Sequence, residues 1–92
     1  MQLTVEFLGL ARNLAQTSEC TVQLEGQATW RDVLRYLALH FPRLVGPVIV
    51  PETFDLVPSY MLNLNGRRVI KDLDMPAQDG QQLLLMFVEA GG

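Results

Sequence analysis

The sequence predicts an α+β fold in which one main helix packs across a mixed five-stranded sheet. Two segments near the start alternate apolar and polar residues, and one later segment repeats apolar residues with helical spacing. A hairpin signal and a continuous apolar run occupy the last third of the chain. With 92 residues, of which 49% are hydrophobic and 18% charged, the chain has the size of one globular domain with a single modest core.

The first two strands are predicted over residues 2–8 and 19–24. Both have the period of two that is typical of a strand with one buried face. Their apolar positions are Leu3, Val5 and Phe7 in the first strand and Cys20, Val22 and Leu24 in the second. Gly9 ends the first strand, and residues 10–15 are expected to form a loop or a short helical turn. The two strands are therefore expected to pair as a hairpin.

The main helix is predicted to begin at Trp30 and to end before Pro42, which has no N–H to continue the helical hydrogen bonds. Thr29 is the expected N-cap, with Asp32 in the place of the usual Glu or Gln of a capping box. The apolar positions recur at helical spacing and are Trp30, Val33, Leu34, Leu37, Ala38 and Phe41. The opposite face carries Arg31 and other charged residues, so replacing Arg31 with alanine is expected to cost little stability.

Residues 42–58 give no periodic signal, because prolines and Gly46 interrupt their short apolar stretches. We expect a compact irregular connection with room for one helical turn. The segment is longer than an ordinary loop and contains Phe54, Leu56 and Val57, so it is predicted to pack on the core. A loop that contacts a partner protein is the alternative.

The last three strands are predicted at residues 60–64, 67–70 and 83–88. Between the first two of these, Asn65-Gly66 favours the positive φ angles of a tight hairpin turn. Residues 72–80 are expected to form a loop before the last strand. The apolar run from Leu83 to Val88 is typical of a strand that is covered on both faces, so this strand is expected at the centre of the sheet.

These elements together predict a β-grasp (ubiquitin-like) arrangement. A right-handed crossover would place the last strand beside the first one in parallel, with the helix lying across the sheet. The domain is expected to span residues 1–88. Residues 89–92 are expected to form a flexible tail that ends in Gly91-Gly92.

Charge and the scarcity of reactive residues limit the possible functions. The net charge of −3 argues against a nucleic-acid partner, which needs a basic face. Cys20 and His40 are the only residues of their types, so no metal site and no internal disulfide are expected. Cys20 is predicted to be a half-buried strand residue rather than a nucleophile. No apolar run is long enough for a membrane span and the start lacks a signal-peptide pattern, so a cytoplasmic protein is expected.

The final glycines give the tail its own chemistry. Without a Cβ, Gly91 and Gly92 can take backbone angles closed to other residues and can pass through a channel too narrow for side chains. Residues 89–92, fully extended, would reach roughly 13 Å. The tail is therefore long enough to enter the active site of a partner, and a frayed terminus without a function is the alternative.

Several segments, in this order along the chain, resemble the MoaD/ThiS family of ubiquitin-like sulfur carriers. They are Val5-Glu6-Phe7-Leu8-Gly9-Leu10-Ala11-Arg12, Phe41-Pro42, Leu64-Asn65-Gly66-Arg67, Asp79-Gly80 and Gly91-Gly92. The chain departs from the family at Gln81, where an acid is common. It departs again at Val88-Glu89-Ala90, where molybdopterin-synthase small subunits often have a proline.

The resemblance implies a carrier protein rather than an enzyme. In such carriers an ATP-dependent activating enzyme adenylates the terminal carboxylate, here that of Gly92, and a sulfur donor converts it to a thiocarboxylate. Gly91 and Ala90 would give the tail access, and a synthase subunit would accept the sulfur for molybdopterin- or thiamine-type biosynthesis. No bound cofactor and no metal are implied, since ATP is used by the activating enzyme.

The partner surface and two other functions remain open. Phe87, Phe7 and Met61 are candidates for an apolar docking patch near the tail. One alternative function is a ubiquitin-like modifier that forms amide bonds with lysines of other proteins. The other is an adaptor domain in which the diglycine has no role. An enzyme is not expected, because no convergent acid, base and nucleophile can be assembled from this sequence.

Overall fold

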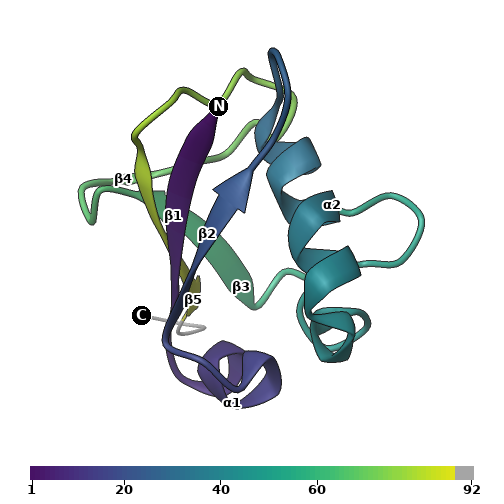
Figure 1. Cartoon of the computed structure of the whole chain (residues 1–92). Coiled ribbons are helices and arrows are strands. Elements are labelled where there is room, and N and C mark those ends of the chain that lie inside the picture. The colour runs from purple at the N-terminus through teal and green to yellow at the C-terminus, as the bar shows by residue number, and fades with distance from the viewer. Residues whose placement is uncertain (89–92) are drawn as a thin grey trace.

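The computed structural model describes residues 1–88 and confirms the predicted five-stranded sheet with a main helix across it (Figure 1). The strands are β1 (Gln2–Phe7), β2 (Glu19–Gln23), β3 (Tyr60–Leu64), β4 (Arg68–Val69) and β5 (Gln82–Phe87). The helices are α1 (Leu10–Ala15), α2 (Trp30–His40) and the 3-10 helix η1 (Pro42–Leu44). Within this described part of the chain, no helix has the length and apolar character needed to cross a membrane.

The strand order is β2-β1-β5-β3-β4, which places β5 at the centre of the sheet as predicted. β5 runs parallel to β1, with Val5 opposite Leu83, and antiparallel to β3, with Leu62 opposite Leu85. β1 and β2 form the predicted antiparallel pair. This mixed sheet with one main helix on it is the β-grasp arrangement.

The prediction that β5 is covered on both faces is wrong. Leu83 and Leu85 are fully buried on the side of α2, whereas Leu84 and Met86 on the other side are only partly buried. Figure 1 shows α2 on one side of the sheet, and none of the helices of residues 1–88 covers the opposite side. The apolar run of this strand thus supplies a core face and an apolar surface. We call the uncovered side the open face.

The core lies between the sheet and α2 and confirms the predicted helix face. Its largest fully buried side chains are Leu3, Val5, Phe7, Val22, Val33, Leu34, Leu37, Leu44, Ile49, Leu62, Leu83 and Leu85. The N-terminus of α2 has the predicted capping box, in which Thr29 and Asp32 each accept a hydrogen bond from the backbone N–H of the other. Burial of one face and a satisfied first turn together hold the helix in place.

The connection after α2 packs on the core as predicted. Leu44 in η1 and the following Val48 and Ile49 are fully buried. Phe54, Leu56 and Val57, the residues from which this packing was predicted, are partly buried and pack against the core. The η1 helix is the single helical turn that the segment was expected to allow.

The hairpin between β3 and β4 has the expected turn. Asn65 and Gly66 have φ angles of 57° and 72°, and the N–H of Arg67 donates to the carbonyl of Leu64 at 3.0 Å. Arg67 closes this turn, so β4 begins at Arg68 and is shorter than predicted. Residues 10–15 form the short helix α1, and the other predicted bounds differ from the observed ones by no more than one residue at an end.

Candidate functional site

The candidate site is the end of the sheet at which the chain leaves β5. Val88 donates its backbone N–H to the carbonyl of Ser59 at 2.7 Å, so pairing continues one residue beyond the strand. The rings of Tyr60 and Phe87 meet edge to face, with centroids 5.6 Å apart. The end of β5 is thus anchored on both its backbone and its last side chain. The predicted reactive residue Gly92, the access residues Ala90 and Gly91, and the predicted flexible tail 89–92 lie outside the described residues.

The three candidates for a docking patch occupy three different environments. Phe7 has no exposed surface, because its side chain faces α2 and packs edge to face on Phe41 at 5.2 Å, so its assignment to a partner surface is wrong. Phe87 is 53% exposed and lies opposite the buried Tyr60, at the end of the helix-covered face. Met61 is partly exposed and lies on the open face. The structure therefore does not bring the three together.

Met61 belongs to an apolar surface that the sequence analysis missed. It lies opposite Met86 on the open face. Asn63, two residues further along β3, points to the same face, and its partners Leu84 and Val69 therefore do so too. Val69 is 40% exposed. We call Met61, Val69, Leu84 and Met86 the open-face patch. The sequence shows that Leu84 and Met86 must point away from Leu83 and Leu85, because alternate side chains of a strand point to opposite faces, but it does not show which face is left uncovered.

Cys20 and His40 do not form a catalytic pair. Cys20 is half-buried, and this burial is the main cause that raises the pKa of its thiol to about 11, with a smaller contribution from the negative charge of Glu19. The thiol therefore stays protonated near neutral pH. His40 ends α2, is exposed, and stacks on Tyr36 with ring centroids 4.0 Å apart. Among residues 1–88, no three His, Cys, Asp or Glu side chains group closely enough to hold a metal ion.

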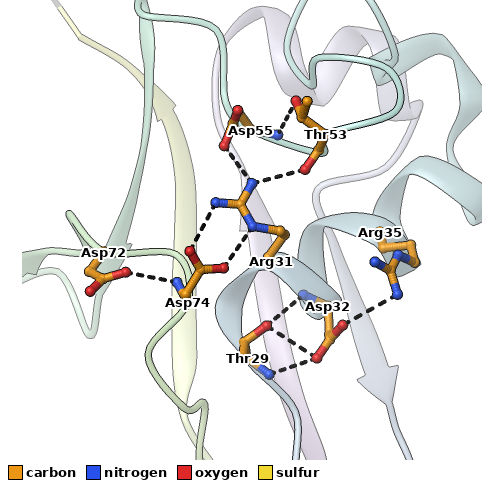
Figure 2. Close-up of polar contacts among 8 residues, drawn as sticks. All are labelled: Thr29, Arg31, Asp32, Arg35, Thr53, Asp55, Asp72 and Asp74. Carbon is orange, nitrogen blue, oxygen red and sulfur yellow. Dashed lines mark hydrogen bonds and ion pairs between the residues drawn. The ribbon is translucent and has the colours of Figure 1, made fainter.

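Arg31 lies on the face of α2 opposite the core, as predicted, but it forms a polar cluster that the sequence did not indicate (Figure 2). Its Nε and Nη2 donate to the carboxylate of Asp74 at 2.8 and 3.4 Å. Its Nη1 donates to the carboxylate of Asp55 and, at 2.9 Å, to the carbonyl of Thr53. One side chain on α2 thus binds both the connection after the helix and the loop before β5.

The same hydrogen bonds shift the acidity of the groups in this cluster. The guanidinium of Arg31 holds the pKa values of the Asp55 and Asp74 carboxyls below their ordinary value. Hydrogen bonds to Asp74 and Asp55 raise the pKa of Arg31 in turn. All three nitrogens of the Arg31 side chain donate within the fold, so the cluster has a structural role.

The chain is similar to known proteins in its three-dimensional structure. No family model matches the sequence, and no curated protein matches it significantly. SAMP1 from Haloferax volcanii is 22% identical over 100% of both chains, with a TM-score of 0.83. A putative molybdopterin converting factor, subunit 1, from Pyrococcus furiosus is 20% identical over 97% of this chain and 99% of its own, with a TM-score of 0.78. A chain of the Amycolatopsis orientalis BexX/CysO complex is 18% identical over 98% of this chain and 99% of its own, with a TM-score of 0.71.

These neighbours are small proteins that match nearly end to end. At this level of identity the likeness establishes the fold. The chain has the ubiquitin-like β-grasp fold of the MoaD/ThiS-like sulfur carriers.

Proposed function

We propose that this chain, with its ubiquitin-like carrier fold, is a sulfur carrier whose terminal Gly92 is adenylated and then converted to a thiocarboxylate. The observation that carries the proposal is the sequence Gly91-Gly92, which follows the central strand β5 after only a few residues. Neighbours of this fold include a putative molybdopterin converting factor subunit, which supports a role in molybdopterin-type biosynthesis, and thiamine-type biosynthesis is the other pathway that the family resemblance implies.

The chemistry explains why a carrier would need an activating enzyme. A carboxylate is a poor electrophile, so an activating enzyme first joins the terminal carboxylate to the AMP part of ATP and releases pyrophosphate. A sulfide-level sulfur donor then attacks the carbonyl carbon of Gly92, and AMP leaves with the electron pair of the broken bond. The product is a thiocarboxylate, which can transfer sulfur to an acceptor held by a synthase subunit. The cytoplasm is the expected compartment, because it supplies the ATP.

The described residues contribute recognition rather than catalysis. The open-face patch and the exposed ring of Phe87 are apolar surfaces on or near β5, and apolar surface of this kind favours protein partners. The activating enzyme, the sulfur donor and the sulfur-accepting synthase subunit are the proposed partners. The reacting atom would be the carbonyl carbon of Gly92.

Intact-mass analysis tests the proposal. The protein is incubated with the activating enzyme of its own genome, ATP and sulfide, and we expect the mass to change by the exchange of one oxygen for sulfur. Deletion of Gly92 should abolish the change. Leu39→Ala, a substitution on the exposed side of α2, should retain it. An unchanged mass of the wild-type protein with every adenylating enzyme of that genome would reject the sulfur carrier.

A protein modifier is the second candidate, because the same fold occurs in small archaeal modifier protein 1 of Haloferax volcanii. A modifier would use the same adenylate, but the amine of a lysine would replace sulfur as the nucleophile. Supplying lysine-bearing target proteins in place of sulfide should then yield covalent adducts. Full cellular function after deletion of Gly91-Gly92 would instead favour an adaptor domain.

A further inference from the structure

The last part of β5 is paired on one side only. Its pairing with β1 stops at Leu85, which lies opposite Phe7 and accepts a hydrogen bond from the N–H of Leu8 at 3.1 Å. Its pairing with β3 goes on to Phe87, which lies opposite Tyr60. Within residues 1–88, the end of β5 therefore relies on the start of β3 for its strand pairing.

The start of β3 is itself fixed to the core. The N–H of Tyr60 donates to the carbonyl of Val57 at 3.0 Å, and the N–H of Val57 donates to the carbonyl of Val48 at 2.9 Å. Val48 is fully buried. The carbonyl of Ser59 accepts the N–H of Val88 at 2.7 Å. Backbone hydrogen bonds thus lead from the core to the last residue that the structure describes.

The ring of Tyr60 holds the last side chain of β5. It meets the ring of Phe87 edge to face, with centroids 5.6 Å apart and an angle of 89° between the planes. Tyr60 is 6% exposed and Phe87 is 53% exposed, so the buried ring sets the orientation of the pair. The hydroxyl of Tyr60 is buried and has no hydrogen-bond partner among the described residues. A buried hydroxyl without a partner does not stabilise a fold, so the contribution of Tyr60 comes from the packing of its ring.

We propose that Tyr60 is a positioning residue that sets the direction in which the chain leaves β5 toward Gly92. It acts through Phe87 and Val88 and does not touch the reacting atoms. The inference rests on the proposed function. A tail that starts from a fixed strand end explores fewer directions than one that starts from a frayed end, so less freedom is lost when its terminus enters an active site. This advantage is the same for every partner that binds the tail.

Amide hydrogen exchange of the full-length chain tests the structural part without any partner. Tyr60→Leu keeps an apolar side chain but removes the aromatic pair, and it should accelerate exchange of the Val88 N–H by about tenfold or more. The N–H of Asn65 donates to the carbonyl of Gln82 at 2.8 Å, at the opposite end of the same strand pair. Its exchange should change by less than about twofold. Tyr60→Phe removes only the unpartnered hydroxyl and should behave as the wild type does.

Leu64→Ala is the matched control. Leu64 lies on the same strand and the same face as Tyr60 and is 8% exposed, but it pairs with Leu83 near the start of β5. Shortening this side chain removes buried surface away from Val88. It should therefore leave the exchange of Val88 relative to that of Asn65 unchanged.

ATP–pyrophosphate exchange by the activating enzyme of the same genome tests the functional part. Tyr60→Leu should raise the KM for this protein by about threefold or more, because a loosely directed tail binds less well. The kcat should stay the same, since the bound tail reacts as before. Tyr60→Phe and Leu64→Ala should each keep the KM within about twofold of the wild type.

Four results would overturn the inference. Exchange of Val88 could stay at the wild-type rate in Tyr60→Leu, or it could rise equally in Leu64→Ala, and in either case Tyr60 does not hold the strand end. If Val88 exchanges faster but the KM is unchanged, the held strand end brings no advantage to the tail. If Tyr60→Phe raises the KM as much as Tyr60→Leu does, the hydroxyl is needed and not the packing of the ring.

Failure of the proposed function gives a different result. The wild-type protein would then support no pyrophosphate exchange with any adenylating enzyme of its genome, and the role of Tyr60 in the carrier reaction would be rejected with the carrier. The amide exchange rates would still decide whether Tyr60 fixes the end of β5.

Discussion

Arg31 joins three segments of the chain through one guanidinium group. Its partners Asp55 and Asp74 lie 24 and 43 residues away in the sequence. The side chains of Asp55 and Asp74 are 49% and 70% exposed. Solvent therefore weakens each ion pair, and the geometry of the whole cluster matters more than either contact alone. Loss of the side chain would remove its contacts to the connection and to the loop together, while the backbone N–H groups of Trp30 and Arg31 would still hold the loop through Met75 and Leu73.

We therefore expect Arg31→Ala to lower the Tm more than Arg43→Ala does. Arg43 is exposed and makes no ion pair with the described residues, so it controls for the loss of one positive charge. The measurement is thermal unfolding by circular dichroism at neutral pH. Equal Tm values for the two variants would show that the cluster contributes nothing measurable.

The Arg31 cluster also predicts a pH dependence. The pKa values of Asp55 and Asp74 lie below 3.8 in the folded protein, so their contribution to stability is fully present above that ordinary value. It is lost as the pH falls through the lowered folded values. The Tm difference between wild type and Arg31→Ala should therefore be largest near neutral pH and should shrink in strong acid. A difference that stays constant down to the lowest pH at which the protein folds would contradict this assignment.

Cys20 should behave as a protected thiol. With its pKa raised to about 11, it holds very little thiolate near pH 8, and burial further limits access. We expect its reaction with a disulfide reagent to be about two orders of magnitude slower than that of a free cysteine. Unfolding in urea should remove the protection. Fast reaction of the folded protein would show that the thiol is accessible and ionised.

At the scale of elements, α2 holds the sheet through one face only. Leu37 is fully buried, whereas Leu39 on the same helix is 75% exposed. Leu37→Ala should lower the free energy of unfolding by about 2 to 5 kcal/mol, since it removes buried methyl groups and leaves a cavity. Leu39→Ala should change it by less than about 0.5 kcal/mol. Urea unfolding of both variants measures the difference, and similar losses would mean that the buried face is assigned wrongly.

The two faces of β5 have different tasks. Leu83 and Leu85 belong to the core, and Leu84 and Met86 belong to the open-face patch. A strand in this position can stabilise the fold and contact a partner at the same time, because alternate side chains point to opposite faces. The same strand leads into the residues that carry the proposed chemistry.

At the scale of the whole molecule, the lysine content limits what the protein can become. Lys71 is the only lysine, and the other six basic residues are arginines, which do not accept acyl groups under ordinary conditions. The amine of Met1 is the other amine, and it donates to the carbonyl of Leu24 at 2.8 Å. We expect any covalent adducts in cells to be single attachments without extended self-linked chains. A regular ladder on a denaturing gel that disappears with Lys71→Arg would favour the modifier over the carrier.

Local patterns were sufficient for most of the fold. The alternation in β1 and β2, the helical spacing in α2 and the turn chemistry of Asn65-Gly66 all act between residues close in sequence, so they can be predicted from short segments. The parallel pairing of β1 with β5 also followed, because the handedness of the crossover leaves few arrangements. The proposed reactive end at Gly91-Gly92 was likewise a matter of sequence and chemistry.

Contacts between distant segments decided the rest. The apolar run of β5 is equally compatible with two covered faces or one, and only the placement of α2 on one side leaves Leu84 and Met86 open. Phe7 is a core residue rather than a surface candidate for the same reason, since its strand turns that side chain toward the helix. The charged partners of Arg31 belong to segments that are far from it in the chain. No local pattern encodes which exposed groups become neighbours, because that is determined only when the elements pack.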